Sequence, residues 1–155
     1  MKTEYDLLQK QLQELISEET YFLPVLSNAS ALLFDALPDL NWAGFYLVRD
    51  EQLVLGPFQG KIACIHIKKG KGVCGSAWEQ DKTLVVEDVH TFPGHIACDC
   101  ASESEIVIPL HKDGKIFGVL DIDSPVKGRF DTEDAAGLEG FAKILEQGMD
   151  PGGIL

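Results

Sequence analysis

The sequence lacks cysteine outside residues 64–100, has only two arginines and contains no long apolar run. A membrane-spanning helix needs roughly 20 consecutive apolar residues, so we expect no membrane segment. The 25 acidic residues outnumber the 13 basic ones, which gives a formal net charge of −12. Phosphate binding needs clustered lysine and arginine, so this charge argues against a nucleic-acid partner.

The first residues also lack the basic start and continuous apolar run of a signal peptide. We therefore expect a cytoplasmic protein, in which thiols stay reduced. Four cysteines crowded into residues 64–100 are then more typical of catalysis or metal binding than of structural crosslinks. With 155 residues and 45% hydrophobic content, we expect residues 1–155 to form a single domain with its own core.

The hydrophobic pattern predicts an α+β domain with a central antiparallel sheet of about six strands, flanked by N-terminal helices and a C-terminal helix. Apolar residues at helical spacing predict helices over 4–19, 27–36, 73–79 and from 131 onward. Aromatic and β-branched runs predict strands over 42–48, 53–56, 63–67, 83–86, 105–110 and 115–122. A long loop at 88–103 suggests function, and the tail at 148–155 should be loose.

The four cysteines differ in their sequence context. Cys64 lies in a predicted strand, where a cysteine is either a small core residue or a reactive thiol. Cys74 follows several lysines and glycines, and nearby positive charge and backbone amides are expected to lower its pKa. Cys98 lies in the long loop, a typical place for a reactive thiol, and Cys100 is too close to it for an easy disulfide.

Metal binding and nucleophilic hydrolysis are two alternatives for these thiols. The C-x-H spacing of Cys64 and His66, like the C-x-C spacing of Cys98 and Cys100, differs from the C-x-x-C of structural zinc sites. We therefore expect no metal. A hydrolase would pair Cys98 with His95, three residues away, but that pairing has little specificity.

Carboxylates and aromatic residues form a second candidate constellation. Asp121 and Asp123 share one face of a predicted strand, and a hairpin places Glu105 on the neighbouring strand. Such acids are ordinarily solvated, but if all three face one pocket their pKa values rise and they can donate protons. Trp42 and Tyr46 also share a strand face, either as core residues or as the wall of a ligand site.

Six segments together closely resemble the free methionine-(R)-sulfoxide reductases, which are built on a GAF domain. These segments are 41–47, 60–67, 70–77, 86–99, 104–110 and 118–125. The resemblance extends over about residues 21–147, and its most specific part is 86–124, because GAF domains at large do not share that string. It implies a GAF fold for this chain.

The resemblance implies reduction of free methionine-(R)-sulfoxide with Cys98 as nucleophile and Cys64 or Cys74 as resolving thiol. It leaves open how Cys74 and Cys98 divide their roles, and Cys100 stands outside the family pattern. Substrate binding and proton donation are implied for Glu105, Asp121, Asp123 and Trp42, with Tyr46 on the same face as Trp42. The resemblance also implies thioredoxin as external reductant, no bound cofactor and a homodimer.

The alternative function is a non-catalytic GAF module that senses a small molecule or a redox change. Such sensors normally carry signalling helices or an output domain, and this chain has little beyond the GAF core. A cyclic-nucleotide ligand is further disfavoured by the shortage of arginine. We therefore expect the enzyme.

Overall fold

The computed structural model describes residues 3–19, 21–94 and 101–150. The helices are α1 Tyr5–Ile16, α2 Phe22–Ala36, α3 Gly72–Gln80, the 3₁₀ turn Val89–Thr91 and α4 Thr132–Gly148. The strands are β1 Trp42–Arg49, β2 Gln52–Gly60, β3 His66–Ile67, β4 Leu84–Val86, β5 Ser104–Lys112 and β6 Lys115–Ser124. All six form one antiparallel sheet in the order β3-β2-β1-β6-β5-β4, which confirms the predicted fold class.

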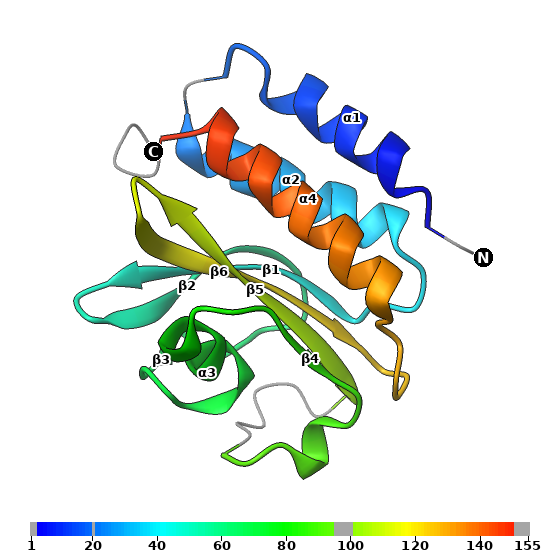
Figure 1. Cartoon of the computed structure of the whole chain (residues 1–155), viewed down its shortest axis with the longest axis vertical. Helices are drawn as coiled ribbons and strands as arrows, with labels where there is room; N and C mark the ends of the chain where they lie inside the picture. The colour runs from blue at the N-terminus through cyan, green and yellow to red at the C-terminus, as the bar shows by residue number, and fades with distance from the viewer. Residues whose placement is uncertain (1–2, 20, 95–100, 151–155) are drawn as a thin grey trace.

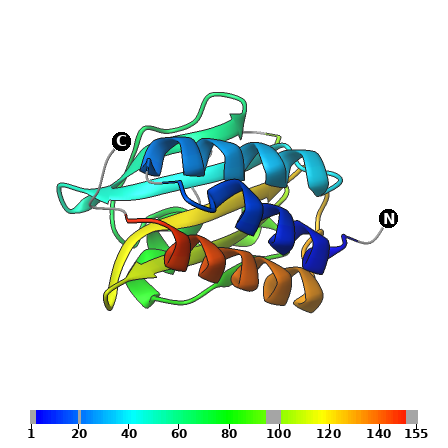
Figure 2. The same ribbon diagram turned by 90° about the horizontal axis from the view of Figure 1, so that it is seen from above.

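The sheet separates two layers of unequal size (Figure 1). Helices α1, α2 and α4 lie together on one face and form the three-helix layer, which Figure 2 shows from above. Helix α3 packs on the opposite face against β5 and β6. Alternate residues of the strands serve the two sides: Leu120 and Ile122 belong to the core under the three-helix layer, whereas Val119 belongs to the smaller core under α3.

Two helix boundaries follow from local chemistry. Helix α2 begins at Phe22, five residues before the predicted start at 27, because Pro24 falls in the first turn, where its missing N–H breaks no intrahelical bond. Helix α4 begins with a capping box, in which Asp131 accepts from the backbone N–H of Asp134 and Asp134 accepts from that of Asp131. In the described part of the chain, no helix is long and apolar enough to cross a membrane.

The hairpins confirm the predicted strand pairs, although β2 extends to Gly60, beyond the predicted 53–56. Both turn residues between β1 and β2, Asp50 and Glu51, have positive φ, which matches the right-handed twist of the strands. The predicted strand 63–67 is shorter than expected, because only His66–Ile67 pairs as β3. Backbone carbonyls just before β3 accept hydrogen bonds from aromatic side chains of β1 in place of a neighbouring strand.

His111 on β5 connects α3 to α4. Its Nε2 lies 2.6 Å from Oδ1 of Asp81, the residue that ends α3, and its Nδ1 lies 3.2 Å from Oε2 of Glu146 on α4. Lys112 donates to the Glu146 carbonyl at 2.7 Å. Burial lowers the pKa of His111, but the hydrogen bonds to Asp81 and Glu146 outweigh burial and raise the pKa above its ordinary value of 6.5.

This arrangement predicts that His111 stabilises the protein at acidic pH. A histidine with a raised folded pKa contributes fully below about pH 6.5, and its contribution is lost as the pH rises through the folded pKa. The side chain is partly exposed, so we expect His111→Asn to cost only a few tenths of a kcal/mol at pH 5.5 and less at pH 8.5. Urea unfolding at both values measures the difference, with His66→Asn on exposed β3 as the control. Equal losses at the two pH values would contradict the prediction.

Candidate active site

Three carboxylates lie side by side on the sheet face that α3 covers. Asp121 and Asp123 project from β6, and Glu105 on β5 pairs directly with Asp123. Their neighbours Leu120 and Ile122 face the opposite core, which confirms the predicted alternation. The carboxylate residues are only 6–8% exposed, so their interpretation as ordinary solvated acids is wrong.

An aromatic stack runs beside these acids on β1 and β2. Trp42 pairs with Asp123 across the sheet. Its ring stacks on Tyr46 at a centroid distance of 5.9 Å and on Phe58 at 5.0 Å. Both β1 aromatics are buried in the core under α3, so in this structure they are core residues, and their role as a substrate wall stays a prediction.

The sequence pattern did not identify Phe58 as a site residue, because its place beside Trp42 depends on how β1 and β2 pair. It pairs with Gly44, the residue between Trp42 and Tyr46 on the same strand face. A Cβ atom at Gly44 would lie 2.3 Å from the Phe58 Cβ. The glycine therefore lets the Phe58 ring cross over β1 and reach Trp42.

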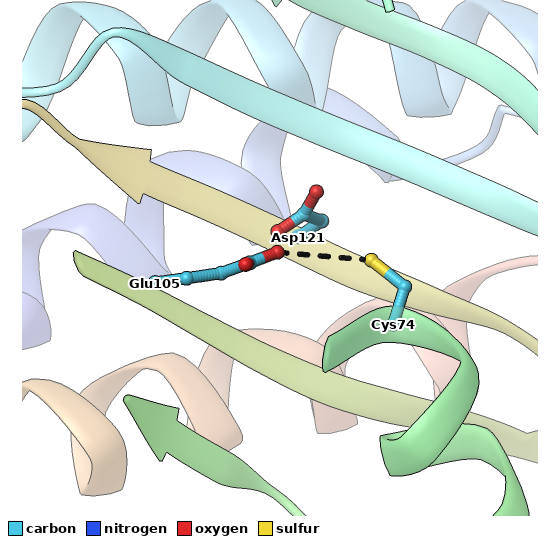
Figure 3. Close-up of side chains that lie close together, drawn as sticks. All are labelled: Cys74, Glu105 and Asp121. Carbon is cyan, nitrogen blue, oxygen red and sulfur yellow. Dashed lines mark hydrogen bonds between the residues drawn. The ribbon is translucent and has the colours of Figure 1, made fainter. Parts of the chain in front are cut away.

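Helix α3 places Cys74 over the carboxylates (Figure 3). The Cys74 Sγ lies 3.9 Å from Oε2 of Glu105 and donates toward it, with Asp121 alongside. Gly75 on α3 lets the loop before this helix pack closely against it, because a Cβ there would lie 2.5 Å from the Lys68 carbonyl oxygen. A thiol and three carboxyl groups therefore share one buried volume between α3 and the sheet.

Burial raises the pKa values of Glu105 and Asp121. Burial raises the pKa of Glu105 well above its ordinary value, and the charges of Asp121 and Asp123 raise it further. Burial likewise raises the pKa of Asp121. A carboxyl group with a raised pKa retains its proton closer to neutral pH and can act as a general acid.

The predicted lowering of the Cys74 pKa is wrong. Burial raises the pKa of this thiol well above its usual value, and the charges of Asp121 and Glu105 add to that effect. The lysines that precede it in sequence are exposed, and Lys69 lies over the Trp78 ring at 5.0 Å. Cys74 in the free protein is therefore a protonated, poorly nucleophilic thiol.

One carboxylate oxygen has no partner within the described residues. Oδ1 of Asp121 is fully buried and accepts no hydrogen bond there. Among these residues, no lysine, arginine or histidine forms an ion pair with Asp121 or Glu105. A buried unsatisfied acceptor costs about 1–3 kcal/mol, and more when it is charged. Within the described residues, Oδ1 of Asp121 is therefore an acceptor without a donor.

Cys64 lies at the outer edge of the same region. It takes part in a disulfide bond, whereas Cys74 is a free thiol. The Tyr46 hydroxyl donates to the Cys64 carbonyl at 2.9 Å, so the aromatic stack also holds the backbone of this cysteine. The remaining predicted residues of the long loop, His95, Cys98 and Cys100, lie outside the described residues.

Comparison with known proteins decides the family. Residues 26–150 match the GAF domain family. The chain is 56% identical to the free methionine-R-sulfoxide reductase of Escherichia coli over 147 residues, covering 94% of this chain and 89% of that protein. The chain belongs to the free methionine-R-sulfoxide reductases of the GAF domain family.

Solved structures of this reductase family agree closely with the fold. The reduced form of fRMsr of Staphylococcus aureus superposes with a TM-score of 0.92 at 55% identity, over 94% of this chain and 95% of that one. The free methionine-R-sulfoxide reductase of Neisseria meningitidis, in complex with its substrate, gives 0.89 at 46% identity, over 92% and 86%.

Two groups of side chains in the described part of this reductase-family chain have metal-binding donors within 4.8 Å of one another. One is the buried set of Cys74, Glu105 and Asp121; the other is the surface set of Asp88, His90 and Glu103. In the surface set the donors already bond to other side chains, because His90 contacts Glu103 at 2.7 Å and Lys127 contacts Asp88 at 3.5 Å. Cys64 and His66, whose spacing differs from that of structural zinc sites, belong to neither group.

The raised pKa of Asp121 predicts that this residue destabilises the ligand-free protein near neutral pH. The folded state holds a proton that the unfolded state has lost, so stability falls as the pH rises from about 3.8 through the folded pKa. Asp121→Asn should remove this loss, so the variant's free energy of unfolding should exceed that of the wild-type protein at pH 7.5, by more than it does at pH 5.5. Urea unfolding at pH 5.5 and 7.5 measures it.

The exposed Asp35 on α2 provides the control, because Asp35→Asn changes the same functional group without a buried partner. An Asp121→Asn protein whose stability falls between pH 5.5 and 7.5 as steeply as that of the Asp35→Asn protein would contradict the assignment.

Proposed function

We propose that the protein reduces free L-methionine-(R)-sulfoxide to L-methionine, the substrate class named for its relatives. The observation that carries this proposal is the buried, unpaired Asp121 oxygen next to Glu105 and Asp123. An α-ammonium group would satisfy it and would compensate the repulsion among the three carboxyl groups. The nitrogen of a methionine inside a peptide is an uncharged amide, so the site favours the free amino acid.

The aromatic stack supplies the complementary apolar contact. Trp42, Tyr46 and Phe58 lie on the same face as the carboxylates, and sulfur makes favourable contacts with aromatic rings. We propose that the substrate's side chain lies along Trp42 while its ammonium group faces the acids. This orientation places the sulfoxide toward the thiols and the protonated carboxyl groups.

Cys98 is the proposed nucleophile. Its thiolate attacks the sulfoxide sulfur while Glu105 or Asp121 protonates the oxygen, so that methionine leaves and the cysteine becomes a sulfenic acid. A second thiol then condenses with the sulfenic acid, which releases water and forms a disulfide. The raised carboxyl pKa values support the role of these acids as proton donors.

The different states of the other two thiols support a division of roles. Cys64 is already engaged in a disulfide, whereas Cys74 is buried and donates toward Glu105. We therefore propose Cys64 as the resolving thiol and Cys74 as a residue that lines the carboxylates. Thioredoxin is the proposed external reductant, and a cytoplasmic homodimer of single-domain chains is the proposed form of the enzyme.

The proposal is tested by incubating the protein with dithiothreitol and one of three substrates: the free (R)-sulfoxide, the free (S)-sulfoxide or a peptide-bound sulfoxide. We expect methionine from the free (R) form and at least a hundredfold less from the others. Absence of turnover on the free (R) form would overturn the proposal, and binding without turnover would favour a sensor.

Single cysteine variants separate the thiol roles. A pre-reduced Cys98→Ser protein should form no methionine even in the first turnover. Cys64→Ser should form one equivalent in the absence of reductant and leave a sulfenic acid that dimedone traps. A Cys64→Ser protein that instead closes a disulfide would contradict its role as resolving thiol, and Cys74→Ser is the matched control.

A further inference from the structure

We infer that residues 61–71, hereafter the docking segment, form the surface on which a protein dithiol docks to reopen the Cys64 disulfide. This inference rests on the proposed function, because it assigns the surface for the reductant of the same catalytic cycle. The segment includes β3, the outermost strand on one side of the sheet, and it lies away from the three-helix layer (Figure 1).

The first observation is the exposure of two large apolar side chains beside the disulfide. Ile62 is 89% exposed and Ile65 is 58% exposed, and Cys64 lies between them. Solvent exposure of two isoleucine side chains is unfavourable, and docking of a partner would relieve it. Single exposed apolar residues are ordinary, but these two flank the bond that a reductant must reach.

The second observation is the local charge. Four of the thirteen basic residues of the chain lie in the docking segment, and no acidic residue occurs from residue 52 to 78. These are the exposed residues Lys61, Lys68, Lys69 and Lys71. The Glu79 carboxylate on α3 lies against Gly70 and offsets part of this charge, so the four lysines leave the segment with a net positive charge. On a protein with a net charge of −12, this basic segment favours a partner with acidic residues around its dithiol, and it steers that partner to the disulfide.

The third observation is that the backbone of the docking segment is already fixed. The Trp42 Nε1 donates to the Lys61 carbonyl at 3.1 Å, the Tyr46 hydroxyl donates to that of Cys64, and the Leu55 amide donates to that of Ile65 at 2.9 Å. A surface that is rigid before binding loses less entropy when the partner docks. These three hydrogen bonds hold the backbone around the two exposed isoleucines in place.

The redox step is a pair of thiol–disulfide exchanges. A thiolate of the partner attacks the Cys64 Sγ, the S–S bond breaks, and the other sulfur of the disulfide leaves as a thiolate and takes up a proton. The partner's second thiolate then attacks the sulfur of the partner's first cysteine in the mixed disulfide, and this releases the Cys64 thiolate. Two electrons pass from the partner's dithiol, which becomes a disulfide, to the disulfide of this protein.

The test compares two reductants on the same variants, with thioredoxin as the protein probe and dithiothreitol as the small one. Ile62→Ser/Ile65→Ser should lower kcat/KM for thioredoxin about tenfold and leave the rate with dithiothreitol unchanged. The control is Leu7→Ser/Leu15→Ser, which removes two exposed leucines (56% and 44%) from the far face on α1. If the double variant does not fold, Ile62→Ser alone provides the test, because that side chain is almost fully exposed.

A charge variant tests the second observation. Lys61→Glu/Lys68→Glu should lower kcat/KM for thioredoxin severalfold at low ionic strength, and the difference should shrink in 0.5 M salt. A thioredoxin whose second cysteine is replaced by serine should be trapped as a mixed disulfide on Cys64.

The outcomes distinguish failure of the docking surface from failure of the proposed reductase function. Turnover with dithiothreitol combined with unchanged thioredoxin kinetics in the isoleucine variants would overturn the docking surface and leave the reductase intact. A trapped disulfide on another cysteine would overturn the attack at Cys64. Failure of the wild-type protein with both reductants would overturn the proposed function itself.

Discussion

The burial of three carboxyl groups on one face of the sheet is the constraint on which the rest of the site depends. Sheet register creates it, because β5 and β6 set Glu105 directly opposite Asp123, and the period of two brings Asp121 to the same face. Helix α3 then closes over them and brings Cys74 into contact. No described side chain supplies the compensating positive charge to Glu105 or Asp121, and protonation or a cationic ligand would relieve this energetic cost.

This cost has a functional counterpart. In the proposed mechanism, the ammonium group of the substrate compensates one buried carboxylate, while a second carboxyl group keeps the proton that sulfoxide reduction consumes. The proposal thus assigns both substrate binding and proton donation to this group of three carboxyl groups. Because their pKa values are raised, Glu105 and Asp121 destabilise the ligand-free protein near neutral pH, and functional sites commonly sacrifice stability in this way.

Most of the architecture could be predicted from the sequence, since it depends on local patterns. Alternation in Leu120-Asp121-Ile122-Asp123 gave the two faces of β6, and the Asp113-Gly114 turn gave the hairpin. What depends on tertiary packing could not be predicted. The pKa of Cys74 is reversed by carboxylates far away in sequence, whereas its sequence neighbours are exposed lysines. Phe58 reaches Trp42 only because β2 pairs with Gly44, a register that the residue pattern alone leaves open.

The central claim, that an ammonium group replaces protons among buried carboxyl groups, is tested most directly by isothermal titration calorimetry with L-methionine, the product. At pH 7, titrations in two buffers of different ionisation enthalpy give the number of protons exchanged on binding. We predict net release of about one proton, and at least tenfold weaker binding of N-acetylmethionine, which lacks the cation. Binding of methionine without proton release, or equal affinity for the acetylated ligand, would contradict this account of the site.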